Sequence, residues 1–408
     1  MIKATRIYLG YSLTNSLLFS MIFTMYNLYV VTVAHLDPLQ LVLLGTALEA
    51  TVFICEVPTG IVADVYSRRL SIIIGNFIVG AGWLLLGFST GFWPILASQV
   101  LWGLGDTFTS GSTQAWISDE LGEEHAAGIF VRGAQYDRAG GLLGIALSVA
   151  VGSMGLALPI LLGGVGFFGI ALALLAWMPE IGFTPRPRQD RTTWQQMIHT
   201  FRSGLGMVRR RPALSGILWI GFFFGLYSEG FDRLWVAHLL DRFTLPALGA
   251  LTLVGWMGIM RGMGALLSIF ATVAIRRWVD VARMRSMVVA MLALSGGIIL
   301  SLAAFALSGE FWLALLTYWT ISVLRNVFEP FYTSWVNHRL DSAVRATVIS
   351  MSSQVDAIGQ IASGPVVGVV ASLAGIPVAL LASCGLLAPV LGLFGIQLKA
   401  GEEISNNA

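Results

Sequence analysis

The stretch GIVADVYSRR, residues 60–69, places Asp64, Arg68 and Arg69 where two apolar runs meet. These runs, residues 38–64 and 70–90, are each long enough to cross a bilayer as a helix, which takes about 20 apolar residues. The whole chain has this character, because 56% of its residues are hydrophobic and only 11% are charged. Soluble domains have roughly 25% charged residues. The sequence therefore predicts an integral membrane protein.

Apolar runs of similar length recur along all 408 residues, separated by short polar breaks. We predict an all-α membrane protein with twelve transmembrane helices in two pseudo-symmetric six-helix halves. The expected helices cover residues 6–34, 38–64, 70–90, 92–118, 127–152, 156–178, 213–240, 246–275, 284–308, 311–337, 344–372 and 375–398.

The Lys and Arg residues predict the orientation, because short cytoplasmic loops collect positive charge. With both termini cytoplasmic, the outer loops hold Arg242 alone and the inner loops hold the other basic residues of the loops. We therefore expect a multi-pass monomer in the cytoplasmic membrane, with the lipid bilayer as its surroundings. The basic residues form no patch with aromatic residues, so no nucleic-acid partner is expected.

Signatures of catalysis and of metal binding are missing from the sequence. It contains no GxxxxGK[ST] loop, no HExxH pair and no serine nucleophile elbow. Cys55 and Cys384 both fall inside expected helices, which argues against a disulfide framework or a metal cluster. We expect neither an enzyme nor a cofactor or metal site.

The expected domains are two halves, residues 1–178 and 213–398, with a cytoplasmic linker at residues 179–212 and a cytoplasmic tail at residues 399–408. Six apolar residues of the linker share one helical face, which is typical of an amphipathic helix on a membrane surface. They are Trp194, Met197, Ile198, Phe201, Leu205 and Val208. A plain linker is the alternative.

The two halves carry traces of a repeat, as many transporters do. A shift of 219 residues places QxDxxG at residues 135–140 on QxDxxG at residues 354–359. The same shift places Asp106 opposite Arg325. One copy therefore carries an acid where the other carries a base.

Residues 60–69 resemble the pattern GxxxDRxGRR, which the major facilitator superfamily carries between its helices 2 and 3. Four residues match it (Gly60, Asp64, Arg68 and Arg69), and two depart from it (Val65 and Ser67). The stretches EVPTGIVAD and AWISDEL are most similar to those of bacterial drug:proton antiporters related to tetracycline and macrolide exporters. The resemblance implies two halves that rock around a midplane site, with the four matching residues as a cytoplasmic gate. The alternative for the two arginines is a plain anchoring role.

Charged residues inside a membrane are costly and are functional hypotheses by default. The resemblance implies that helices 1, 4, 7 and 10 line the cavity. On these helices we select four acids as candidates for proton coupling and two arginines as their charge partners. The acids are Asp106, Glu229, Asp232 and Glu329, and the arginines are Arg233 and Arg325.

Two spacings of four residues suggest how these charges pair. Glu229 with Arg233, and Arg325 with Glu329, can each meet on one helical face. If helices 4 and 10 face each other, Arg325 must choose between Asp106 and Glu329, and protonation would change that choice. Static ion pairs that fix helix packing are the alternative. Asp137, Arg261 and Asp356 are expected at the interface between the halves, where Arg261 with Asp137 forms either a gate or structural glue.

Aromatic and polar residues gather on the expected cavity helices. We predict that seven of them line a substrate cavity: Tyr26, Asn27, Tyr227, Phe231, Trp256, Trp319 and Phe328. Such rings favour a bulky amphiphilic compound over a sugar, which would require many more hydroxyl-binding side chains.

The function expected from the sequence is proton-coupled export of hydrophobic or amphiphilic organic compounds, with protons and a small-molecule substrate as partners. A proton-coupled importer or a lipid or metabolite carrier of the same fold stays open, because Ile145 takes the proline position of the antiporter pattern GxxxGPxxGG in helix 5. A non-transporting receptor or scaffold is the alternative from another class.

Overall fold

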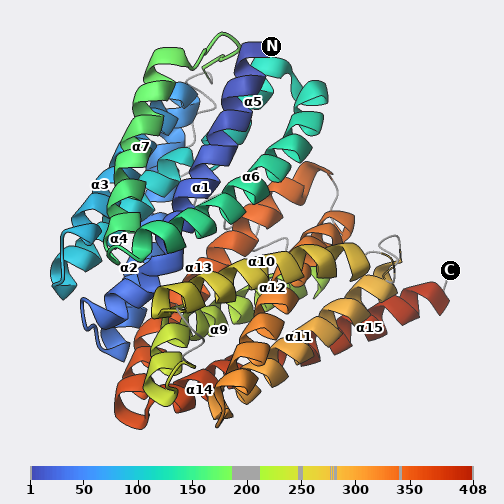
Figure 1. Ribbon diagram of the computed structural model, residues 1–408. Coiled ribbons are helices and arrows are strands. Elements are labelled where there is room, and N and C mark those ends of the chain that lie inside the picture. Colours follow the sequence, from blue (N-terminus) through green and yellow to red (C-terminus); the bar gives the residue numbers. More distant parts are fainter. Residues whose placement is uncertain are drawn as a thin grey trace. The chain divides into compact units, whose positions relative to one another are not determined.

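The computed structural model describes residues 2–185, 212–246, 251–275, 283–339 and 342–406, together with Arg277 and Val279. Every regular element in these ranges is an α-helix (Figure 1). The helices are α1 (Ile2–Thr32), α2 (Pro38–Val65), α3 (Arg68–Gly87), α4 (Phe92–Thr109), α5 (Ser112–Leu121), α6 (Glu123–Gly152), α7 (Leu158–Trp177), α9 (Pro212–Arg242), α10 (Leu253–Ile275), α11 (Met284–Leu307), α12 (Phe311–Arg339), α13 (Ser342–Ala374), α14 (Ile376–Leu387) and α15 (Pro389–Asn406). The amphipathic segment expected within residues 192–208 lies outside the described residues.

These helices confirm the expected all-α architecture of twelve spans. Two spans are divided into two helices each, which the sequence reading did not anticipate. The fourth consists of α4 and α5, because Gly111 adopts a φ of 70° that ends the regular helix. The twelfth consists of α14 and α15, which meet at Pro389, a residue that fits the start of a helix.

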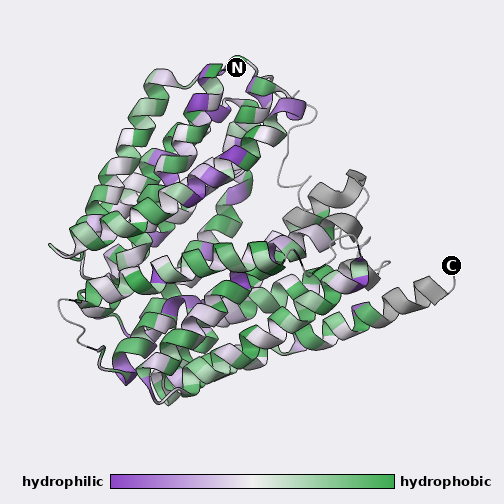
Figure 2. Ribbon diagram, turned by 45° about the vertical axis from the view of Figure 1, so that its right-hand side comes forward, coloured by the Kyte–Doolittle hydropathy of each residue, from purple (hydrophilic) through white to green (hydrophobic). Residues whose placement is uncertain are grey.

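Apolar length supports the spanning assignment. Eight helices of the described part are long and apolar enough to cross a membrane by themselves. Figure 2 shows hydrophobic residues along nearly every helix. Many of the large hydrophobic residues have exposed side chains. Examples are Phe270, Leu300 and Leu373, whose exposed fractions are 70%, 72% and 84%. Such surfaces suit lipid rather than water.

Spatial contacts divide the described chain into two compact units. One consists of Met1–Leu36, Ala47–Met197 and Ala247–Gly262, and the other of Asp37–Thr46, Ile198–Pro246 and Met263–Ala408. Two helices therefore contribute to both units: α2, which changes unit after Thr46, and α10, which changes unit after Gly262. The simpler boundaries expected from the sequence stay a prediction.

The two units repeat the same helix packing. In the first, α1 packs on α6 and α7, and α3 packs on α4 and α7. In the second, α9 packs on α13 and α14, and α11 packs on α12 and α14.

The glycines of the two QxDxxG copies occupy matching places in this packing. A Cβ at Gly140 would overlap the carbonyl of Leu13, and a Cβ at Gly359 would overlap the carbonyl of Phe222. Each glycine thus allows the close approach of two helix backbones. The sequence repeat is therefore a repeat of helix contacts.

Candidate functional site

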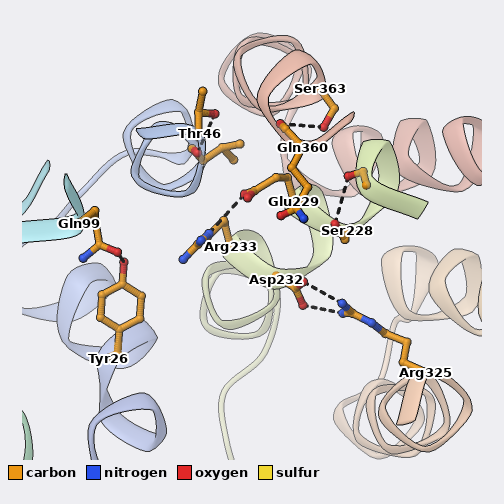
Figure 3. Close-up of polar contacts among 12 residues, drawn as sticks. Tyr26, Thr46, Gln99, Ser228, Glu229, Asp232, Arg233, Arg325, Gln360 and Ser363 are labelled. Carbon is orange, nitrogen blue, oxygen red and sulfur yellow. Dashed lines mark hydrogen bonds and ion pairs between the residues drawn. The ribbon is translucent and has the colours of Figure 1, made fainter. Parts of the chain in front are cut away.

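The buried charges of the second unit gather around α9. Glu229 and Arg233 lie one helical turn apart, and Arg233 Nε donates to Glu229 Oε2 at 3.3 Å, as their spacing predicted (Figure 3). Only 2% of the Glu229 side chain and 12% of the Arg233 side chain are exposed. This pair is therefore sealed from solvent.

Part of the seal comes from the first turns of α2, which belong to the same unit. Gly45 lies so close to the pair that a Cβ there would overlap the Glu229 carboxylate and Arg233 Nε. Two glycines of α13 bring this end of α2 close, because Cβ atoms at Gly364 and Gly368 would overlap Thr46 and Leu39. The backbone of α2 is thus the cover of the ion pair.

Asp232, the residue before Arg233, forms a second ion pair. Arg325 of α12 binds Asp232 in a bidentate arrangement, with Nη1 to Oδ1 at 2.5 Å and Nη2 to Oδ2 at 2.8 Å (Figure 3). The sequence did not point to Asp232 as the partner of Arg325, and the expected choice of Arg325 between Asp106 and Glu329 stays a prediction. The contact between α9 and α12 that brings Asp232 to Arg325 has no signature in residue spacing.

The Asp232–Arg325 pair is accessible, unlike its neighbour. Its side chains are 45% and 28% exposed. The guanidinium lies over two rings of α9, 5.6 Å from the centroid of Tyr227 and 5.7 Å from that of Phe231. Cation–π attraction of this kind holds an arginine independently of its carboxylate. The Tyr227 hydroxyl beside it is buried and has no hydrogen-bond partner among the described residues.

Two further acids border this cluster, which we call the α9 charge cluster (Glu229, Asp232, Arg233 and Arg325). Asp356 of α13 accepts a hydrogen bond from Gln360 Nε2 at 2.7 Å. Glu329 of α12 is exposed. Both acids lie close enough to act electrostatically on one another, and Asp356 also senses Asp232 and Arg325. The cluster and its border hold more acids than bases.

Asp106 lies in the other unit, in the last turn of α4. Its carbonyl accepts hydrogen bonds from Ser110 N at 2.8 Å and from Thr109 Oγ1 at 3.0 Å. Its carboxyl group lies close enough to Glu56 of α2 for the two like charges to interact. The approach of Asp106 to Arg325 stays a prediction.

The aromatic residues expected to line a cavity are mostly buried inside the helix bundles. Tyr26, Tyr227, Phe231, Trp256 and Phe328 are each at most 5% exposed. Asn27 and Trp319 are half-buried. The rings pack on other rings, for example Phe328 on Phe224 at a centroid distance of 4.2 Å. Most of this set therefore packs inside the helix bundles, and its place at a substrate cavity stays a prediction.

Around Tyr26 the structure adds three residues that sequence reasoning missed. The Tyr26 hydroxyl donates to Gln99 Oε1 at 3.2 Å (Figure 3). Trp83 and Trp102 pack against each other at 5.1 Å, and each has a buried indole N–H without a partner in the described residues. Trp102 precedes Gly103 on an expected cavity helix, which was the available signal.

The motif of residues 60–69 is held by groups that follow it in the sequence. Arg68 Nη1 lies 2.7 Å from Asp119 Oδ2, at the end of α5. Ser67 Oγ and Arg69 N donate to the two carboxylate oxygens of Glu180, at 2.6 Å and 2.8 Å. We call these five residues the α2–α3 loop cluster. Sequence reasoning missed Asp119 and Glu180, although each follows an expected helix end and Asp119 stands in the acidic stretch of residues 119–124.

Charges of both signs act on Asp119 within this cluster. Burial raises the pKa of Asp119 above its usual value, and the Arg68 guanidinium opposes that rise. Asp64 lies 4.0 Å from Arg68 Nη2. Gly60 has open space among the described residues where a Cβ would stand.

The expected interface residues Asp137 and Arg261 do not form an ion pair in the described structure. Asp137 is exposed, and its carbonyl accepts a hydrogen bond from Ser16 Oγ at 2.6 Å. Gly225 is the counterpart of Ser16 in the second unit, because a Cβ there would overlap the Asp356 carbonyl. The two aspartates thus mark equivalent helix contacts, whatever their side chains do.

The chain is similar to known membrane transporters. Residues 9–364 match the model of the Major Facilitator Superfamily. The chain is 25% identical over 349 residues to the uncharacterized MFS-type transporter YxaM of Bacillus subtilis (strain 168), covering 83% of this chain and 82% of that protein.

Solved structures agree in fold. The nucleoside transporter NupG is 15% identical, with a TM-score of 0.77 over 97% of this chain and 99% of that chain. The peptide transporter POT in complex with sulfate is 16% identical, with a TM-score of 0.75 over 98% and 95%. At these identities the likeness concerns the fold alone. The family match covers most of the chain, which is therefore a multi-pass membrane transporter, not an enzyme, and belongs to the Major Facilitator Superfamily.

Proposed function

We propose that this protein is a proton-coupled secondary transporter that exports hydrophobic or amphiphilic organic compounds by alternating access. It acts as a monomer in the cytoplasmic membrane, with both termini inside. The observation that supports coupling is the presence of two ion pairs on adjacent positions of α9, one sealed and one accessible. A carboxylate that can be reached by water in one state and sealed in another can carry a proton across the membrane.

The two pairs divide the work in this proposal. The accessible Asp232–Arg325 pair binds the substrate. The sealed Glu229–Arg233 pair exchanges a proton with water when the part of α2 around Gly45 moves away from it. Asp106 and Glu329 are the remaining candidates for proton coupling. The α2–α3 loop cluster would then serve the cytoplasmic gate.

Export is proposed on the resemblance of two stretches to drug exporters. Uptake is the second candidate, and the bidentate Asp232–Arg325 pair favours it. If protonation of Asp232 releases Arg325 to bind a substrate, proton and substrate load together, and the inward proton gradient would drive the compound inward.

The test uses purified protein in liposomes that contain a pH-sensitive dye, with an imposed proton gradient. Lipophilic cations, tetracycline-like and macrolide-like drugs, amphiphilic carboxylates, sugars and nucleosides are added in turn. We expect an amphiphilic compound to trigger proton movement in the wild type. The same assay is run on four variants: Asp106→Asn, Glu229→Gln, Asp232→Asn and Glu329→Gln. Glu310→Gln is the matched control, because Glu310 is exposed between α11 and α12. The proposal is contradicted if only sugars trigger proton movement, or if none of the compounds does.

A further inference from the structure

We propose that Arg325 and Tyr227 form a binding site for the anionic head group, a carboxylate or a phosphate, of an amphiphilic substrate. This inference deepens the proposed function through its second candidate, uptake, and rests on its proton coupling. The site lies within the second unit, on α9 and α12.

The first argument is the geometry of the guanidinium. Both terminal nitrogens of Arg325 face one carboxylate, at 2.5 Å and 2.8 Å. This planar fork matches a carboxylate or a phosphate, because two parallel N–H donors meet two oxygens. Asp232 now occupies the place that a substrate carboxylate would take.

The second argument is the difference between the two partners of the pair. Asp232 is the more exposed, with 45% of its side chain accessible against 28% for Arg325. Arg325 is also held over the Tyr227 and Phe231 rings. If the pair opens, the carboxylate can turn toward water while the guanidinium stays where it is.

The third argument is the sign of the charge that the site accepts. A protein arginine does not lose its proton. A cationic substrate that took Asp232 would therefore leave the Arg325 guanidinium charged and without its carboxylate partner. Protonation of Asp232 combined with an anion on Arg325 keeps the guanidinium paired.

The neighbouring groups leave this position to an external anion. Glu229 is engaged with Arg233, and Asp356 is held by Gln360. On α12 itself, Glu329 is the internal acid that could compete for Arg325, and it has no ion pair with Arg325 in the described structure. The helix α14, which also packs on α9, brings no acidic or basic residue.

A second donor completes the site. Tyr227 is 1% exposed, its ring centroid lies 5.6 Å from the Arg325 guanidinium, and its hydroxyl lacks a hydrogen-bond partner among the described residues. A buried hydroxyl without a partner is unfavourable. It would donate to an anion bound at Arg325, and the Phe231 ring beside it suits an apolar substrate body.

The experiment is chemical rescue of the purified protein, read as its thermal unfolding temperature. Asp232→Asn removes the internal carboxylate and leaves the fork. We expect a lower unfolding temperature that rises with added 4-phenylbutyrate, rises less with acetate, and does not rise with 4-phenylbutylammonium. The double variant Asp232→Asn/Arg325→Gln is the control, and should lose the response. Glu310→Gln, at an exposed acid between α11 and α12, should leave the wild-type response to 4-phenylbutyrate in place.

The outcomes separate this proposal from the transport proposal. No rescue of Asp232→Asn by either carboxylate, or an equal rise in the double variant, overturns the anion site even if other compounds move protons. Rescue without any proton movement in liposomes supports the site and removes the transport proposal. If Asp232→Asn does not fold, 4-phenylbutyrate must stabilise the wild type more at mildly acidic than at mildly basic pH. The reverse order overturns the inference.

Discussion

Replacing Gly45 by alanine places one methyl group against the sealed ion pair of α9. The new Cβ would overlap the Glu229 carboxylate and Arg233 Nε. The carboxylate has little room to retreat, because its side chain is only 2% exposed. Overpacking of this kind costs about 1–3 kcal/mol. Alanine recovers at most about 1 kcal/mol through its better helix propensity. We expect a net loss of stability and partial exposure of Glu229.

The measurement is thermal unfolding of the purified protein, with Gly385→Ala as the matched control. Gly385 lies inside α14 of the same unit and has open space where a Cβ would stand, so the control should unfold at or slightly above the wild-type temperature. A double-mutant cycle identifies the clash. The effect of Gly45→Ala should largely disappear in a Glu229→Ala/Arg233→Ala background. If the same loss persists there, the cover assigned to Gly45 is wrong.

Four further substitutions test other contacts. Ser67→Ala removes the N-terminal cap of α3 and its bond to Glu180, and should cost about 0.5–2 kcal/mol of unfolding free energy; no difference from Ser89→Ala in thermal unfolding would contradict the cap. Glu180→Gln removes a charge-assisted acceptor of Arg69 N, so amide hydrogen exchange at Arg69 should become faster, and unchanged exchange would show that the carboxylate does not hold the loop. Gly140→Ala and Gly359→Ala should each lower stability by about 1–3 kcal/mol, whereas Gly128→Ala on the same helix as Gly140 should not; a penalty at only one of the first two would contradict the repeated helix contact.

The fold could be predicted because its signals are local. A run of apolar residues predicts each span, and the helices begin and end near the expected positions. The break between α4 and α5 was missed because Ser110 and Gly111 interrupt an otherwise continuous apolar run. A glycine inside such a run is compatible with a helix, and only its backbone conformation shows that the helix ends.

The candidate site could be predicted only where partners lie on one helix. Glu229 and Arg233 are four residues apart, and helix geometry brings them together. Asp232 and Arg325 are on different helices, so their pairing depends on the rotation and axial position of α9 against α12. The same limit explains Glu180, which follows α7 in the sequence whereas its partners Ser67 and Arg69 lie at the start of α3. Residue spacing carries no information about such contacts.

The two units share their helix contacts but differ in their chemistry. Where Gly141 of α6 approaches Ser16 and Ser20, the repeat shift places Gln360, which binds Asp356. The contacts of Gly140 with Leu13 and of Gly359 with Phe222 place α1 on α9 with a shift of 209 residues. On that shift Ser20, Phe23 and Thr24 of α1 match Glu229, Asp232 and Arg233 of α9. A repeated scaffold can supply the same helix movement to both units. A pair of charges that must open and close has to be present in only one of them, because coupling needs a proton site to be sealed in one state and open in another. We therefore expect substitutions in the α9 charge cluster to change coupling, and matching substitutions at Ser20, Phe23 and Thr24 to change stability or substrate fit without changing the response to protons.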